Sequence, residues 1–231
     1  MELNAKEVYK ILRKKKVTDL YHANTVVTSC TFLREGRLLA RGTLAEKGLS
    51  QTAQDSDSKD VKYGLWYDLF LDDDDIHERV KVGRVNSYGP VLFVLDLQLL
   101  QKDWLASMWA TKSNPLYWDK VLPAKRYFST LEEFSKDYRK GTTEHMLVLR
   151  HIGGVLRLRP YLKRIILDDP HMAWADGVDV YSAAHGALHA AARAGGLSDL
   201  AIERRPCAET CVCKTEYPAL EDDKFYRFFA P

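Results

Sequence analysis

A histidine, two tyrosines and a glutamate occupy positions in this sequence where their side chains could do chemistry. His22 lies in the apolar stretch "DLYHAN", Tyr63 and Tyr67 lie in "YGLWYDLF", and Glu144 begins "EHMLVL". A neutral imidazole offers one donor and one acceptor nitrogen, and an aromatic face can hold a flat heterocycle. A carboxylate can stabilise developing positive charge or take a proton. Whether these groups act together depends on the elements that hold them.

The residues around His22 predict a strand over 19–23 and a helix over about 26–36. Apolar residues recur at helical spacing after the strand, and Gly36 suits the end of a helix. The segment "RLLARG" that follows is predicted to be a short extended segment. His22 is therefore expected on a strand whose following helix ends at Gly36.

The remaining predicted elements alternate irregularly between strands and helices. Further strands are predicted in "YGLWYDLFLD", "GPVLFVLDLQLL", "TEHMLVLRHIG", "LKRIILDD" and "DLAIERRPC". Further helices are predicted over 2–16, in "FSTLEEFSKDYRKG" and in "VYSAAHGALHAAARAGG". The polar stretch 43–62 is expected to be a loop, and the run Asp72 to Asp75 a solvated turn. The order predicts a single α+β domain with a mixed sheet and helices inserted between strands.

Composition excludes several classes of protein. The 231 residues are 46% apolar and carry a net charge of only +2, so no global field draws the chain to nucleic acid or membrane. No stretch is long and apolar enough for a membrane span, and the polar N-terminus does not resemble a signal peptide. We therefore expect a cytoplasmic protein without membrane contact, whose four cysteines are reduced.

The cysteines at 207, 211 and 213 raise the question of a metal site. His185 and His189, four residues apart on one predicted helix, could complete such a site. The C-x3-C-x-C spacing is not the usual C-x-x-C knuckle, so we predict no metal ligands and assign these cysteines to a C-terminal tail.

The familiar catalytic motifs are absent from this sequence. It contains no P-loop, no G-x-G-x-x-G after a strand, no G-x-S-x-G elbow and no H-E-x-x-H helix. Asp96 with Glu132 or Glu144 could suggest a metal-dependent nuclease, but the lysine of such sites is missing from the expected spacing. The nuclease stays a minor alternative.

The order of a histidine strand, a tyrosine-containing strand and a late glutamate resembles the histidine–tyrosine–glutamate branch of the ADP-ribosyltransferase superfamily. The branch carries [YF]-H-x-[ST] on its first strand and a turn after the next helix, which "LYHAN" and "FLREGRLL" resemble. Asn24, two residues after His22, stands where the family has a serine or threonine, and it can likewise donate and accept hydrogen bonds. Thr142, two residues before Glu144, differs from the paired acid or amide of the arginine–serine–glutamate branch.

The resemblance implies a fold and a role for each residue. The fold would be a split mixed sheet flanked by helices over 19–206, preceded by a basic helix over 1–18 and followed by a tail over 207–231 packed on the domain. His22 would hydrogen-bond a ribose hydroxyl of NAD, with Asn24 beside it. Tyr63 or Tyr67 would stack on nicotinamide. Glu144 would be the catalytic residue, acting on the charge that grows on the ribose.

The resemblance also implies a substrate and an acceptor. NAD would be the substrate, and Arg41, or failing that Arg84, would hold its phosphates, since a guanidinium pairs with phosphate at two points. DarT-type toxins of this branch modify nucleic acid, so RNA or DNA is the expected acceptor. The role would be that of a toxin or antiphage effector with a neutralising partner, and the aromatic residues at 104–118 would stack on a splayed base.

Three alternatives to this function stay open. A protein could be the acceptor, or the same fold could transfer a 2′-phosphate from RNA to NAD. The chain could also be a non-catalytic binding domain in which these strands serve only the core.

Overall fold

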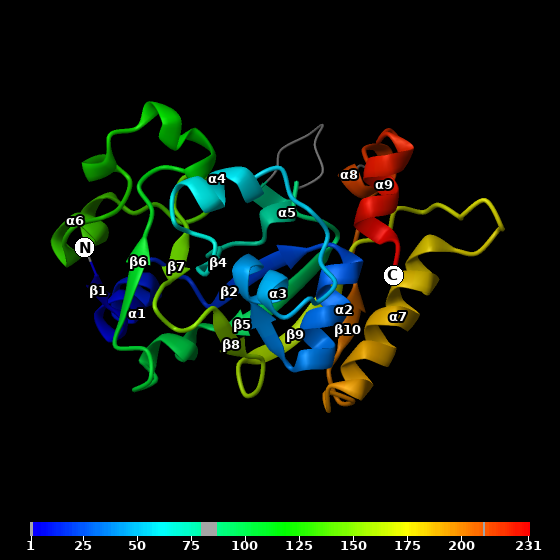
Figure 1. The fold of residues 1–231 in the computed structure, drawn as a ribbon, viewed down its shortest axis with the longest axis horizontal. Coiled ribbons are helices and arrows are strands. Elements are labelled where there is room, and N and C mark those ends of the chain that lie inside the picture. The colour runs from blue at the N-terminus through cyan, green and yellow to red at the C-terminus, as the bar shows by residue number, and fades with distance from the viewer. Residues whose placement is uncertain (1, 80–86, 210) are drawn as a thin grey trace.

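The computed structural model describes residues 2–79, 87–209 and 211–231, and two four-stranded sheets make up much of the core (Figure 1). In the first sheet, of order β10-β9-β5-β2, β9 and β10 are parallel and the other neighbours antiparallel. Its strands are β2 (Asp19–Asn24), β5 (Val91–Asp96), β9 (Leu162–Leu167) and β10 (Ile202–Arg204). The first sheet is therefore mixed.

The second sheet, of order β1-β6-β7-β4, is antiparallel throughout. Its strands are β1 (Leu3–Asn4), β4 (Leu69–Leu71), β6 (Ser107–Ala110) and β7 (Leu147–Leu149), and a separate ribbon pairs β3 (Arg37–Leu39) with β8 (Val155–Arg157). Tyr21 and Asp72 exchange two backbone hydrogen bonds, each 2.9 Å long. The two sheets therefore meet where β2 passes the end of β4.

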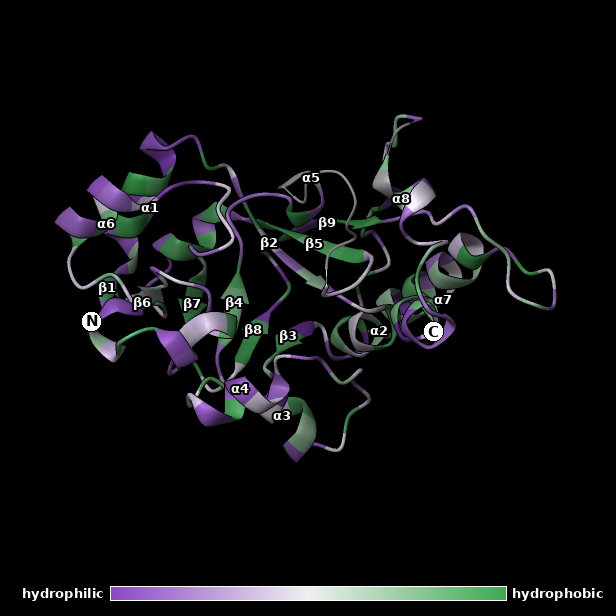
Figure 2. Cartoon of the chain, turned by 90° about the horizontal axis from the view of Figure 1, so that it is seen from above, coloured by the Kyte–Doolittle hydropathy of each residue, from purple (hydrophilic) through white to green (hydrophobic). Residues whose placement is uncertain are grey.

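The central strand β5 is buried on both faces, as its continuous apolar sequence predicts. Phe93 and Leu95 belong to the main core, whereas Leu92 and Val94 pack on the opposite face with Ile76. This alternation follows from the two-residue period of a strand. Figure 2 shows hydrophobic residues concentrated in the strands, while α4 and α6 carry more polar ones.

Helix α2 (Val26–Glu35) follows β2 directly because its two ends carry strong local signals. The Thr25 side chain accepts a hydrogen bond from the backbone of Thr28, and Gly36 ends the helix with a φ of 61°. Helix α2 packs against α7 (Val180–Ala194) beside the first sheet (Figure 1). The remaining helices are α1 (Ala5–Lys14), α3 (Arg41–Glu46), α4 (Asp57–Lys62), α5 (Ile76–Arg79), α6 (Leu131–Asp137), α8 (Val212–Thr215) and α9 (Asp222–Phe229), with 3-10 helices η1 (Leu97–Gln101), η2 (Pro115–Lys120) and η3 (Pro123–Lys125).

The C-terminal segment packs on the helices of the first sheet. Helix α9 contacts both α2 and α7. Its phenylalanines form a second hydrophobic cluster with α7 and α8, made of Val180, Cys213, Tyr217, Phe225, Phe228 and Phe229. The segment after residue 207 is therefore folded into helices and buries its own apolar face.

The predicted combination of helices with a mixed sheet is confirmed, as are the strand at 19–23 and the helix at 26–36. Two local predictions are wrong. The stretch 43–62 contains α4 and most of α3 rather than a continuous loop, and the strand expected over 63–72 is limited to β4. None of the helices in the described ranges has the length and apolarity that crossing a membrane requires.

The prediction of a solvated turn at Asp72 to Asp75 is also wrong, because three of these four aspartates are buried. The Asp73 carboxylate accepts a 2.8 Å hydrogen bond from the Tyr138 hydroxyl, and Asp75 forms a 2.6 Å ion pair with Arg205. Partners distant in sequence therefore compensate the burial of these charges, which the local sequence could not reveal.

Candidate functional site

A pocket with about 850 Å³ of space, part of it open to solvent, lies where the two sheets meet. Residues 22–24 of β2, the end of β3 with Arg41, and residues 68–72 around β4 contribute to its lining. Gln54 and residues of α4 cover another side, and residues 114–116 with Met146 complete it. Its lining combines apolar side chains with a few polar and charged groups, as in small-molecule sites.

His22 lines the pocket as a neutral imidazole. Its Nδ1 atom lies 2.9 Å from the carbonyl oxygen of Phe70, which can only accept, so Nδ1 carries the proton. Burial between the rings of Phe32 and Phe93 lowers the pKa of His22. The Nε2 atom is buried and has no hydrogen-bond partner among the described residues. It therefore presents an acceptor that a hydroxyl of a ligand could satisfy.

Asn24, the last residue of β2, is buried at the same pocket. Its Oδ1 atom accepts a 2.9 Å hydrogen bond from the backbone of Thr25, which leaves the amide nitrogen as the group to donate. Gly89 lies against this turn with a φ of 127°, and a Cβ atom there would approach the Asn24 backbone to 2.6 Å. Only glycine fits this approach without displacement.

Arg41, at the start of α3, is oriented by Asp57. Its Nε and Nη2 atoms donate to the two carboxylate oxygens of Asp57 over 2.9 and 2.6 Å. The Nη1 atom is buried without a hydrogen-bond partner in the described structure. Arg41 therefore lines the pocket as a fixed fork with one unused donor group.

Two carboxylates in the lining have pKa values that are raised toward neutral pH. Burial raises the pKa of Asp60 to about 6, against the opposing effects of Ser56 and Arg41. Burial likewise raises the pKa of Asp68 to about 6, although Arg150 lies 3.1 Å from its Oδ2 atom and opposes the shift. The charge of the pocket therefore changes with pH near neutrality.

The structure does not bring Tyr63 and Tyr67 into this pocket. The Tyr63 hydroxyl donates to Asp119 over 2.6 Å, and its ring packs on Trp118. Tyr67 is 47% exposed and donates to Glu46. Tyr88 lines the pocket instead, although no motif in the sequence marks it. Arg84, the second arginine predicted for the phosphates, lies outside the described residues.

Glu144 is exposed and lies beside the pocket rather than in its lining. It is two residues before Met146, which lines the pocket. The side chain of Asn114, another lining residue, donates a 2.9 Å hydrogen bond to the carbonyl of Thr143. The backbone that carries Glu144 is therefore attached to the pocket wall.

The aromatic region at 104–118 contributes only one end to the pocket. Asn114, Pro115 and Leu116 are lining residues, and Tyr117 next to them is 62% exposed. Trp118, in contrast, is buried and donates to the carbonyl of Ser113. Tyr117 is thus exposed next to the pocket lining, whereas Trp118 serves the core.

Among the described residues, the side-chain groups that could hold a metal ion gather around Cys213 and not in this pocket. No protein-family model matches the chain, and no curated protein sequence matches it either. The function must therefore be argued from the pocket and its residues.

Proposed function

We propose that this pocket binds NAD and that the protein is an ADP-ribosyltransferase that acts on nucleic acid. The observation that carries the proposal is the meeting of His22, Asn24 and Arg41 in one pocket. The resemblance to the histidine–tyrosine–glutamate branch picked out these three residues for one ligand. The polar groups of the pocket support the same ligand.

Each of these three side chains could form a hydrogen bond with a particular part of NAD. The Nε2 atom of His22 would accept from a ribose hydroxyl, because its Nδ1 proton is already held by Phe70. The Nη1 group of Arg41 would donate to a phosphate oxygen while Asp57 keeps the fork in place. The amide nitrogen of Asn24 would donate to a neighbouring ribose oxygen.

The stacking role predicted for Tyr63 or Tyr67 fits Tyr88 better. Tyr88 is an aromatic residue of the lining, whereas the other two rings pack or point elsewhere. An aromatic face holds the flat nicotinamide ring with little loss of conformational freedom. We therefore place Tyr88 against the nicotinamide.

The reaction follows from these contacts. The bond between the ribose and nicotinamide breaks, and nicotinamide leaves with the bonding electron pair. The positive charge on the ribose is stabilised by the carboxylate of Glu144, which would turn toward the pocket from its position before Met146. A nucleophilic atom of the acceptor then bonds to the ribose, and its proton passes to Glu144 or to water.

A nucleic-acid acceptor is supported by the exposed ring of Tyr117 beside Leu116. A base that is unstacked from its neighbours can stack on such a ring while its reactive atom enters the pocket. The further proposal is a cytoplasmic toxin or antiphage effector with a neutralising partner protein, which rests on the resemblance to DarT-type toxins.

The test is a transfer assay with NAD labelled in its adenine ring. The purified protein is incubated with labelled NAD and, separately, with RNA, DNA and lysate protein, and nicotinamide release is measured in parallel. We expect label on RNA or DNA together with nicotinamide release. Label on protein, or NAD-dependent loss of a 2′-phosphate from RNA, would favour an alternative. No binding and no consumption of NAD would refute the proposal.

A further inference from the structure

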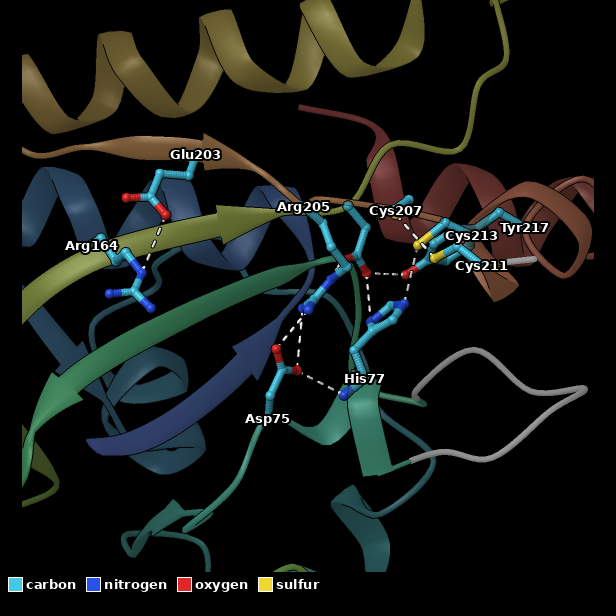
Figure 3. Close-up of polar contacts among 10 residues, drawn as sticks. Asp75, His77, Arg164, Glu203, Arg205, Cys207, Cys211, Cys213 and Tyr217 are labelled. Atoms are coloured by element: carbon cyan, nitrogen blue, oxygen red, sulfur yellow. Dashed lines mark hydrogen bonds and ion pairs between the residues drawn. The ribbon is translucent and has the colours of Figure 1, made fainter. Parts of the chain in front are cut away.

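Three cysteines and a histidine converge at a second place, between the C-terminal segment and α5 (Figure 3). The Sγ atoms of Cys207 and Cys211 lie 3.0 Å apart, and the Sγ atom of Cys213 lies 3.2 Å from Nε2 of His77. The three sulfur atoms all lie within 4.8 Å of one another. The imidazole of His77 thus meets this group of sulfur atoms at Cys213, from 136 positions earlier in the sequence.

The ring of His77 is oriented by a buried carboxylate. Its Nδ1 atom lies 2.8 Å from Oδ2 of Asp168, so Nδ1 holds the proton and Nε2 keeps its lone pair toward Cys213. Asp168 also accepts from the hydroxyl of Tyr217 over 2.6 Å and from Arg205. A carboxylate that fixes a histidine through its second nitrogen is a recurrent arrangement behind metal-bound histidines.

The sulfur atoms are not accounted for by a disulfide. A disulfide bond is about 2.05 Å long, shorter than the distance between Cys207 and Cys211. Simple core packing does not account for them either, because the three sulfurs lie close together, Cys213 also contacts the imidazole nitrogen of His77, and Cys207 and Cys211 are only partly buried. A ligand that several sulfur and nitrogen atoms can bind at once would account for this arrangement.

We propose that Cys207, Cys211, Cys213 and His77 bind a zinc ion. Tetrahedral zinc with bonds of about 2.3 Å to sulfur and about 2.0 Å to nitrogen separates sulfur atoms by about 3.8 Å and sulfur from nitrogen by about 3.5 Å. The Cys207–Cys211 and Cys213–His77 distances of 3.0 and 3.2 Å lie just below these values, and the three sulfurs already form one group. Binding of the ion would draw the imidazole of His77 from Cys213 toward the centre of the three sulfurs. Asp168 then serves as the outer partner of His77.

This ligand set differs from the one considered from the sequence. His185 and His189 stack on each other, and His185 stacks on Tyr181, along α7. The fourth ligand is instead His77, which lies 136 residues before Cys213. The proposed site therefore departs from our prediction of no metal ligands, and only the fold brings its fourth member to the cysteines.

Four protein ligands leave no open position, so the zinc would be structural. It would join α5 to α8, which carries Cys213, and to Cys207 and Cys211, which precede that helix. Ile76, next to His77, lines the pocket described above, so the ion would also hold one wall of that pocket. The inference stands on its own geometry and does not depend on the proposed NAD chemistry.

The first test measures zinc in the purified full-length protein by elemental mass spectrometry. We expect one zinc ion per chain in the wild type and in the control Cys30→Ser, because Cys30 is buried in the main core away from the cluster. The variant Cys211→Ser should retain less than a tenth of the zinc. A wild type that contains no zinc and takes up none when Zn²⁺ is added would overturn the proposal, as would a Cys207–Cys211 disulfide found by mass mapping.

A second measurement keeps the proposal testable if a variant fails to fold. Cobalt(II) is exchanged into the wild-type protein, and the absorption spectrum is recorded. The proposal predicts thiolate-to-cobalt charge-transfer bands for three thiolates together with the visible bands of a tetrahedral ion. A spectrum of octahedral cobalt without thiolate bands would contradict it. In His77→Gln the thiolate bands should persist while the visible bands shift.

Discussion

The Nδ1 atom of His22 donates a 2.9 Å hydrogen bond to the carbonyl oxygen of Phe70, which ties β2 of the first sheet to β4 of the second. This bond fixes the neutral tautomer and leaves Nε2 as a buried acceptor at the pocket. A position that unites two sheets and still has an unsatisfied nitrogen is well suited to bind a ligand.

Arg41→Lys should weaken NAD binding about tenfold, or about 1.4 kcal/mol. Lysine keeps the charge but loses the planar fork that Asp57 orients and the free Nη1 donor. Calorimetric titration of NAD and of nicotinamide riboside, which lacks the phosphates, measures the effect. The exposed Arg13→Lys is the control. Equal weakening of both ligands would mean that Arg41 does not contact phosphate.

Glu144→Gln should reduce transfer about 100-fold or more while NAD affinity stays within about twofold. The change removes the charge but keeps the shape of a side chain that lies outside the pocket lining. Labelled transfer and calorimetry are measured side by side, with the exposed Glu132→Gln as control. Transfer at the wild-type rate would remove Glu144 from the mechanism and direct attention to Asp68.

Asp60→Asn should stabilise the protein at pH 8 but not at pH 4. The pKa of Asp60 in the folded protein, about 6, lies above its ordinary 3.8, so the folded state binds the proton more tightly. The protonated Asp60 carboxyl therefore stabilises the wild-type fold fully below pH 3.8, and this stabilisation is lost as pH rises through 6. The neutral amide of Asn keeps it at pH 8. One pKa unit corresponds to about 1.4 kcal/mol, and partial exposure reduces the total, so we expect about 1–2 kcal/mol at pH 8.

Urea unfolding of Asp60→Asn and of the exposed Asp55→Asn at both pH values checks this expectation. The free energy of unfolding of Asp60→Asn should exceed that of the wild type only at pH 8. A difference of the same size at pH 4 would show that packing, not charge, is responsible. Asp57 and Asp68 are the neighbouring acids that raise this pKa, and Arg41 is the neighbouring base that lowers it.

Gly89→Ala should destabilise the protein more than Gly48→Ala. Both glycines have a positive φ, 127° and 61°, but only at Gly89 does an added Cβ meet the Asn24 backbone, at 2.6 Å. Backbone strain of this kind costs about 1–3 kcal/mol, and the close contact adds to it at Gly89. Thermal unfolding of the two variants gives the comparison. Equal midpoints would indicate that the turn at Gly89 can move away from β2.

The strand that carries His22 and the helix after it could be predicted because their signals are local. The apolar stretch, the cap at Thr25 and the left-handed Gly36 all lie within a few residues of the elements that they define. Helix α4 could not be predicted in this way, because it buries no residue of its own and packs through Lys59 and Lys62 near η2. Its stability comes from tertiary contacts rather than from an apolar pattern.

The composition of the two sites was predictable only in part. His22, Asn24 and Arg41 lie within 20 residues of one another, and a sequence motif can link them. Tyr88 and the carboxylates of Asp60 and Asp68 reach the pocket from other segments, without a pattern to mark them. The approach of His77 to Cys213 likewise depends on how α5 and the C-terminal segment pack.

The most direct test of the central claim is the thermal stabilisation of the protein by NAD. At a concentration about 100 times the dissociation constant, NAD should stabilise the folded state by about 2.7 kcal/mol, which raises the unfolding midpoint by about 5–10 °C. His22→Ala should lose this shift whatever its own midpoint, and His189→Ala, on α7, should keep it. A wild type whose midpoint NAD does not change, or an undiminished shift in His22→Ala, would contradict the account.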